Sequence, residues 1–353
     1  IPLSGNIYVV KRITSQDVAD LAGVSRTTVS FVLNNVQRFN ISTETRKKVL
    51  EAAEALGYVP LASAQALASN TARAIGLVMT RSPQYISSDA FMPQIIAGML
   101  DIVKEQKLGL LIELVEPGEQ RQTYLKLIRA KHIDGMILLT PRNDDEGLVE
   151  LQELNIPAVV MGRLISATGL SSVDIDNRAA ARTAVEHLIG LGHRRIGCIL
   201  NAPVPYSSAY ERLAGYQDAL AQYGITPDQN WIKSADFDPM SGYTQMKLLL
   251  EEANRPTAVF IASDNVAIGA MLAMRDNGVR VPEDISIVGF DDIPSARFFA
   301  PPLTTIRTPA RELAQKSCFL LLDLISGRVK PPVHLTVETE LIIRQSSQRL
   351  FNG

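Results

Sequence analysis

The sequence contains little of what builds disulfide scaffolds, metal centres or membrane spans. Only two of its 353 residues are cysteine, Cys198 and Cys318, which excludes a disulfide framework and a multi-cysteine zinc site. So few cysteines fit a reducing compartment, and we expect a cytoplasmic protein. No apolar run reaches the roughly 18 residues that a membrane-spanning helix needs. Residues 1–6 also lack the basic and apolar segments of a secretory signal.

Signature motifs of common enzymes are missing too. The apolar run at 75–79 is not followed by the GxGxxG pattern that binds a dinucleotide, and the chain has neither a P-loop lysine nor a GxSxG nucleophile turn. The four histidines are too scattered along the chain to form a metal cluster. We therefore expect a binding protein without catalytic residues, metal or cofactor.

The chain does have enough apolar sequence for large cores. Hydrophobic residues make up 46% and charged residues 20%, and the length fits two or three domains. The first 60 residues show three short helical patterns. From residue 75 onward short apolar runs alternate with amphipathic stretches, which predicts βαβ units and two lobes built on parallel sheets. The proline pairs at 301–302 and 331–332 are candidate crossings between the lobes.

The clearest local signal is the spacing of residues within 14–34. Ala19 lets two helices cross closely, Gly23 suits the turn between them, and Val29 packs the second helix, which is typical of a helix-turn-helix. Polar residues on the outer face of the second helix disfavour an ordinary helical hairpin. Residues 1–70 carry seven basic and five acidic side chains whereas the whole chain has a net charge of −2, a mild asymmetry that fits a DNA-binding head.

These residues resemble the DNA-binding head of the LacI (lactose repressor) family, and the similarity continues through the rest of the chain. The segments that carry it, in family order, are ITSQDVADLAGVS at 13–25, TVS at 28–30, VLN at 32–34, STETR at 42–46, GYVP at 57–60, RAIGLV at 73–78, GHRRI at 192–196, RLAGY at 212–216, SD at 263–264, VGFDD at 288–292 and PLTTI at 302–306.

The resemblance implies a small all-α helix-turn-helix head and an α/β body of two lobes, like a periplasmic sugar-binding protein, with parallel sheets flanked by helices. The domain boundaries that we expect are 12–60 for the head, 61–73 for a hinge helix or linker, 74–172 and 304–331 for the first lobe, and 173–303 and 332–346 for the second lobe.

In this family the second helix lies in the major groove, so the resemblance implies that Arg26 and Thr27 read bases. An arginine can form a bidentate pair with guanine. Positions that fit phosphate contacts are Gln16, Ser25, Thr28 and Asn34.

Two positions of the DNA-binding region depart from the family pattern, and one matches it closely. Phe31 stands where members commonly have arginine, so this site should contact a thymine methyl group or make no contact. Gln65 replaces a frequent arginine in the hinge. Leu67 matches the leucine that both subunits insert into the central minor-groove step, which kinks the DNA.

A sugar-like ligand calls for a carboxylate and an arginine that bind hydroxyls and for an aromatic face that stacks on the ring. The resemblance assigns these roles to Asp291, Arg212 and Phe237. Phe91 matches an aromatic residue of the first lobe, and Tyr206 lies in a second-lobe loop that often contacts the effector. The remaining matched positions are Ser263 for a polar contact, Asp264 for orienting its loop and Arg163 at a cleft-facing edge.

The function that we expect is a homodimeric repressor of carbohydrate-utilisation genes, which binds palindromic operator DNA and a small sugar-like effector. An effector between the lobes would rotate them and separate the paired hinge helices, although the sequence leaves open whether it releases or promotes DNA binding. A global catabolite regulator with a phosphorylated protein corepressor is the main alternative. A sugar carrier or an enzyme on the same body fold is a more distant one.

Overall fold

The computed structural model describes residues 13–34, 40–59, 71–80, 89–116, 118–164 and 169–350, and the chain divides into two compact units between residues 73 and 74.

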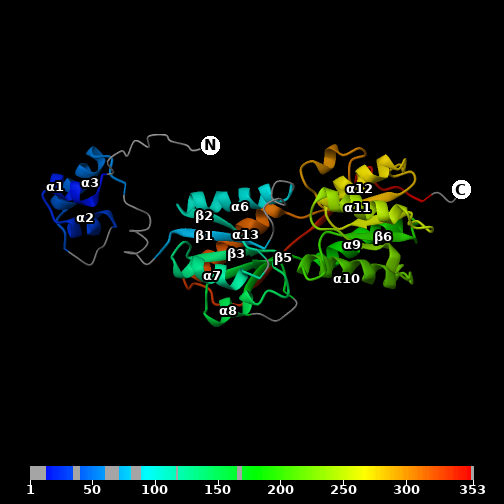
Figure 1. The fold of residues 1–353 in the computed structure, drawn as a ribbon, viewed down its shortest axis with the longest axis horizontal. Helices are drawn as coiled ribbons and strands as arrows, with labels where there is room; N and C mark the ends of the chain where they lie inside the picture. Colours follow the sequence, from blue (N-terminus) through cyan, green and yellow to red (C-terminus); the bar gives the residue numbers. More distant parts are fainter. Residues whose placement is uncertain are drawn as a thin grey trace, which may run out of the picture. The chain divides into compact units, whose positions relative to one another are not determined.

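The first unit is a bundle of three helices, α1 (Ser15–Ala22), α2 (Arg26–Leu33) and α3 (Thr43–Ala55) (Figure 1). Thr14 begins α1 through a capping box, because its side chain accepts from the backbone N–H of Asp17 and its own backbone N–H donates to the carboxylate of Asp17. Gly23 ends α1 with φ 67°, a left-handed conformation that glycine adopts without strain. The three predicted helices are therefore confirmed. The bundle's core consists of Val18, Ala19, Val29, Val32, Val49, Ala52 and Ala53.

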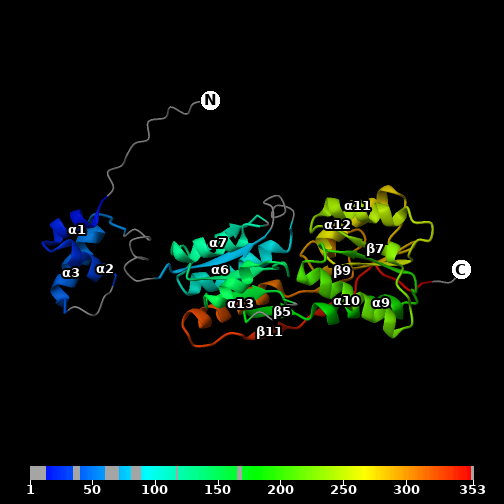
Figure 2. The same ribbon diagram turned by 60° about the horizontal axis from the view of Figure 1, so that its bottom comes forward.

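The first lobe of the body is a six-stranded parallel sheet with helices on both faces (Figures 1 and 2). In sheet order its strands are β11 (His334–Val337), β5 (Ser171–Ile175), β4 (Ala158–Met161), β3 (Gly135–Leu139), β1 (Ala74–Met79) and β2 (Gly109–Leu114). Its helices are α6 (Met92–Glu105), α7 (Gln120–Arg129), α8 (Gly147–Glu153) and α13 (Ala310–Ile325). Successive residues of a strand face opposite sides, so Leu77 packs in the core that contains α6 and α13 residues, and Val78 in the core that contains α7 and α8 residues.

The second lobe repeats this plan with one antiparallel edge strand, β12, which pairs with β10. In sheet order its strands are β12 (Glu340–Ile342), β10 (Thr305–Arg307), β9 (Ser286–Asp291), β8 (Ala258–Ile261), β6 (Ile196–Leu200) and β7 (Ile232–Ser234). Its helices are α9 (Asn177–Gly190), α10 (Ser207–Gln222), α11 (Pro239–Leu250) and α12 (Asp264–Asp276), with short 3-10 helices η1 (Gln229–Trp231) and η2 (Ala296–Phe298). Helix α9 packs on α10, and α11 packs on α12.

The chain passes between the lobes after β5, after β10 and after β11, later than the predicted boundaries at 172/173, 303/304 and 331/332. Residues 173–175 still belong to the first-lobe sheet, 305–307 to the second-lobe sheet and 334–337 to the first-lobe sheet. Both proline pairs lie in loops, and each is followed by one more strand of the same lobe. A strand of three or four residues carries no pattern that shows which sheet it joins.

None of the described helices is long and apolar enough to cross a membrane.

Candidate functional site

Most of the residues expected to contact DNA lie on α2 or at its ends. Arg26 and Thr27 are exposed in the first turn of α2, and the Nε of Arg26 donates to the Oγ of Ser15 at 2.9 Å. Ser25 is the N-cap of α2, and its Oγ accepts from the backbone N–H of Thr28. Two expected phosphate contacts therefore also fix the start of the helix that would enter the groove.

The other expected DNA contacts lie further from this turn. Gln16 is exposed near the start of α1 and donates to Asp20, and Asn34 ends α2. Phe31 is half-buried on α2. Leu67 lies outside the described residues.

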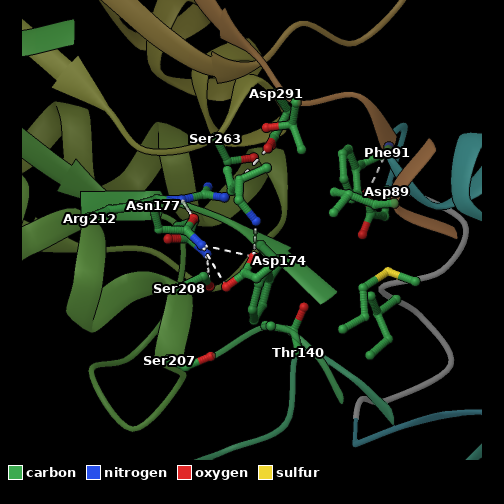
Figure 3. Close-up of a pocket in the computed structure, with 18 residues that line it drawn as sticks. Asp89, Phe91, Thr140, Asp174, Asn177, Ser207, Ser208, Arg212, Ser263 and Asp291 are labelled. Carbon is green, nitrogen blue, oxygen red and sulfur yellow. Dashed lines mark hydrogen bonds and ion pairs between the residues drawn. The ribbon is translucent and has the colours of Figure 1, made fainter. Parts of the chain in front are cut away.

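A cleft between the two lobes brings together several residues expected to bind the effector (Figure 3). The empty space within it is about 680 Å³, which includes open solvent at its mouth. The expected residues that line it are Phe91 from the first lobe and Arg212, Phe237, Ser263 and Asp291 from the second lobe.

Arg212 is the most constrained of these side chains. It is 7% exposed, its Nε donates to the Oδ1 of Asn177 at 2.9 Å, and its Nη1 donates to the carbonyl oxygen of Ala262 at 2.6 Å. The guanidinium lies 3.7 Å from the centroid of the Phe290 ring, a cation–π contact. These contacts fix the plane of the guanidinium, and its Nη2 faces Asp291.

Asp291 is the last residue of β9 and lies at the carboxyl end of a parallel strand, where open α/β sheets bind ligands. Its Oδ1 is 3.7 Å from the Nη2 of Arg212, and the residue has φ 112°, an uncommon conformation for a side chain other than glycine. The pair places a donor and an acceptor side by side at the cleft wall.

The aromatic residues fall into two groups. Phe91 is the N-cap of α6, and Phe237 follows β7 in the second lobe; both are half-buried and line the cleft. Tyr206 does not line it: the ring packs edge-on against Phe237 with centroids 5.1 Å apart, and the hydroxyl donates to the carbonyl oxygen of Thr80 in the first lobe. The guanidinium carbon of Arg142, also in the first lobe, lies 5.4 Å from the centroid of the Tyr206 ring. The structure thus places Tyr206 behind the cleft, where it joins the lobes.

Asp264 is also absent from the cleft wall. It is fully buried behind Ser263, accepts from the hydroxyl of Thr305 at 2.7 Å and from the backbone N–H of Ile293 at 3.0 Å. Burial and the nearby charge of Asp291 raise the pKa of Asp264 well above its usual value. These contacts connect the start of α12 to β10 and to the loop after β9.

Arg163 is exposed and lines a neighbouring groove with His334 and Thr336. It does not line the cleft between the lobes, although the preceding residue, Gly162, does.

Several polar residues of the cleft were not expected from the sequence: Asp89, Thr140, Asp174, Asn177, Asn201, Ser207, Ser208 and Thr308. Asp174 accepts from the Nδ2 of Asn177 at 3.1 Å, which continues the hydrogen-bonded run from Arg212 (Figure 3). Burial raises the pKa of Asp174 to about 7, although the charge of Arg212 opposes this shift. A signal was present for Asn201, which directly follows the apolar run 196–200, but not for Asp174, which lies within the mixed segment SSVDI at 171–175.

Comparisons with known proteins cover nearly the whole chain. The family model of bacterial regulatory proteins of the lacI family matches residues 14–60, and that of the periplasmic binding protein-like domain matches 185–347. The transcriptional regulator CelR of Thermobifida fusca is 35% identical over 338 residues, 95% of this chain and 98% of CelR. The transcriptional repressor CytR of Escherichia coli K12 is 37% identical over 338 residues, 96% of this chain and 97% of CytR.

Solved structures of regulators are also similar over nearly the whole chain. A CelR–cellobiose complex has a TM-score of 0.74 and 34% identity, and the match covers 95% of this chain and 100% of that chain. A lac repressor dimer bound to operator and the anti-inducer ONPF has a TM-score of 0.82 and 32% identity, and covers 96% and 100%. The expected fold, a helix-turn-helix head on a two-lobed body, is confirmed.

Proposed function

Because this chain belongs to the lacI family of bacterial regulatory proteins, and so is a DNA-binding transcriptional regulator, we propose that it is a repressor whose affinity for operator DNA is controlled by an uncharged sugar bound between its lobes. The observation that carries the proposal is the Arg212–Asp291 pair at the cleft wall, with Phe237 and Phe91 nearby. A sugar hydroxyl both donates and accepts, so it satisfies this pair, and the aromatic rings suit the apolar face of a sugar. The relative CelR is solved with cellobiose, which supports a sugar ligand.

The DNA-binding part of the proposal rests on α2. Arg26 and Thr27 are exposed at its first turn, and the bond from Arg26 Nε to Ser15 leaves the two Nη groups available for the O6 and N7 of guanine. We propose that a homodimer places two such helices on a palindromic operator. The similar lac repressor, which is solved as a dimer bound to operator, supports this arrangement. Leu67 of each subunit would insert at the centre of the operator.

Selection of binding sites from random DNA tests the role of Arg26. The Arg26→Ala variant should lose its preference at one base position in each half-site and retain the others. Lys47→Ala is a matched control, because Lys47 is an exposed cation on α3 that pairs only with Glu51 within the described contacts. It should weaken binding slightly with an unchanged consensus. An unchanged consensus for Arg26→Ala contradicts the assignment.

The regulatory part predicts that effector binding changes operator affinity through the two lobes. We propose that the sugar lowers operator affinity by a coupling of about 1–3 kcal/mol, or roughly 5- to 150-fold. A thermal-shift screen of sugars and nucleobases identifies a ligand, and fluorescence anisotropy with the selected operator measures the coupling. A ligand that binds without any change in operator affinity contradicts this proposal, and a response to nucleobases alone contradicts the sugar.

A further inference from the structure

Buried polar atoms without a hydrogen-bond partner gather at the cleft. Over the described part of the chain five such side-chain atoms occur, and three of them line this one cavity: the Oδ1 of Asn201, the Oγ of Ser207 and the Oγ1 of Thr308. The three residues are 3%, 1% and 5% exposed. They come from separate elements, since they follow β6, begin α10 and follow β10.

Such a set calls for an explanation, because most buried polar groups in proteins are hydrogen-bonded and an unpaired one destabilises the fold. Scattered exceptions would point to local strain. Three that converge on one cavity from three elements point to a partner that the chain itself does not supply. Ser207 faces across the cleft, since its Oγ lies 3.5 Å from the position of a Cβ on Gly162 of the first lobe.

The chemistry of the atoms restricts that partner. The Nδ2 of Asn201 already donates to the Oγ of Ser208, and the unpaired Oδ1, as an amide oxygen, can only accept. The hydroxyls of Ser207 and Thr308 both donate and accept, and α10 begins at Ser207 without a side-chain cap, so its first N–H groups suit an oxygen of the ligand. A ligand hydroxyl meets both demands.

The charges of the cleft restrict the ligand further. Its wall carries the carboxyl groups of Asp89, Asp174 and Asp291 against the single guanidinium of Arg212. The Nε and Nη1 of Arg212 already donate to Asn177 and Ala262, and its Nη2 forms an ion pair with Asp291 at 3.7 Å. A phosphate group would therefore lie beside the carboxylate of Asp291, and the one cation among the lining residues already pairs with that carboxylate.

We infer that Asn201, Ser207 and Thr308 form an effector subsite beside the Arg212–Asp291 pair, which binds hydroxyl groups of an uncharged ligand and, because the carboxylate of Asp291 lies beside it, rejects the phosphorylated form of that ligand. The inference rests on the proposed function, because it assigns further contacts to the same cleft. It predicts that a phosphorylated small molecule is not the effector.

The first test needs no ligand and uses the melting temperature of the full chain. Ser207→Ala and Thr308→Val remove unpaired hydroxyls, so these variants should melt at or above the temperature of the wild type. Ser346→Ala and Thr305→Val are matched controls, since these hydroxyls are equally buried but hydrogen-bonded. The controls should melt about 2–4 °C lower. If Ser207→Ala and Thr308→Val melt as low as the controls, the hydroxyls have partners within the chain and the inference is wrong.

The second test measures binding by calorimetry with paired probes: cellobiose, glucose beside glucose 6-phosphate, and ribose beside ribose 5-phosphate. Wild type should bind at least one neutral sugar, and its affinity for the phosphorylated member of a pair should be at least tenfold weaker. Ser207→Ala and Thr308→Val should each weaken binding of that sugar by about fivefold or more. Equal or tighter binding of the phosphate, or full affinity in both variants because water alone occupies the subsite, overturns the inference. If no neutral sugar binds, the proposed function fails, and the melting test still decides the state of the hydroxyls.

Discussion

Asp291 is the residue at which ligand affinity and folding stability can be separated. The Asp291→Asn change keeps the shape of the side chain of a residue that is 8% exposed but removes its charge. A hydrogen bond to a charged group contributes about 1.5–3 kcal/mol, so its loss should weaken sugar binding by roughly 10- to 150-fold. The neighbouring Arg212 stays fixed by its bonds to Asn177 and Ala262, so the rest of the wall keeps its geometry.

The stability of the Asp291→Asn variant should change little, because two effects oppose each other. The change removes the attraction between Asp291 and Arg212, whose atoms are 3.7 Å apart. It also removes the repulsion that contributes to the raised pKa of Asp264. We expect a shift in melting temperature of no more than about 2–4 °C, which corresponds to about 1 kcal/mol.

Calorimetry with the sugar that stabilises the wild type, together with a melting curve, checks both expectations. Asp284→Asn is the control, because Asp284 pairs with Arg280 on the surface of the same lobe and does not line the cleft. Its sugar affinity should equal that of the wild type. Full affinity in a well-folded Asp291→Asn variant would remove Asp291 from the ligand site and refute the reasoning.

Three further variants test other parts of the body. Burial raises the pKa of Asp174 to about 7, so between about pH 4 and pH 7 the folded chain keeps a proton that the unfolded chain releases, and the free energy of unfolding falls as pH rises. In denaturant titrations Asp174→Asn should therefore be more stable than wild type at pH 8 but not at pH 4. Equal gains in stability at both pH values would contradict this. Tyr206→Phe removes the hydroxyl that donates to Thr80 across the lobes, so calorimetry should show sugar affinity reduced about 2- to 10-fold, and an unchanged affinity would show that this contact does not favour the bound state. Gly215→Ala should destabilise the fold by about 1–3 kcal/mol in urea titrations, because a Cβ there would lie 2.1 Å from a backbone oxygen of α9. A Cβ at Gly190 meets open space, so the control Gly190→Ala should not destabilise the fold. Equal stability of the two variants would contradict the close packing of α9 and α10.

The head could be predicted closely because its signals are local. Thr14, Gly23 and Ser25 each act within one helical turn, and all three lie at the helix ends that they predict. The βαβ alternation likewise predicts two lobes with parallel sheets. The sheet to which β10 or β11 belongs is not local information, because it depends on which earlier strand has a free edge.

The cleft could be predicted in part for the same reason. Asp291 and Arg212 were found from the resemblance, and the end of an apolar run independently places Asp291 at a sheet edge. Ser207 and Thr308 carry no such mark, since a serine or threonine in a loop usually faces solvent. Tyr206 was expected to touch the ligand, yet its contact with Thr80 depends on how the two lobes meet.

The position of Thr80 connects these observations to regulation. It directly follows β1, which begins at Ala74, immediately after the segment 61–73 expected to form the hinge. Strand β1 pairs with β2 on one side and β3 on the other, so it cannot shift by itself, and the first lobe must move with it as one body. Tyr206 contacts the residue that follows one end of this strand, and the other end leads to the segment that we expect to form the hinge. A ligand that changes how the lobes meet can therefore act on the hinge through the first lobe as a whole, without a separate chain of side-chain contacts.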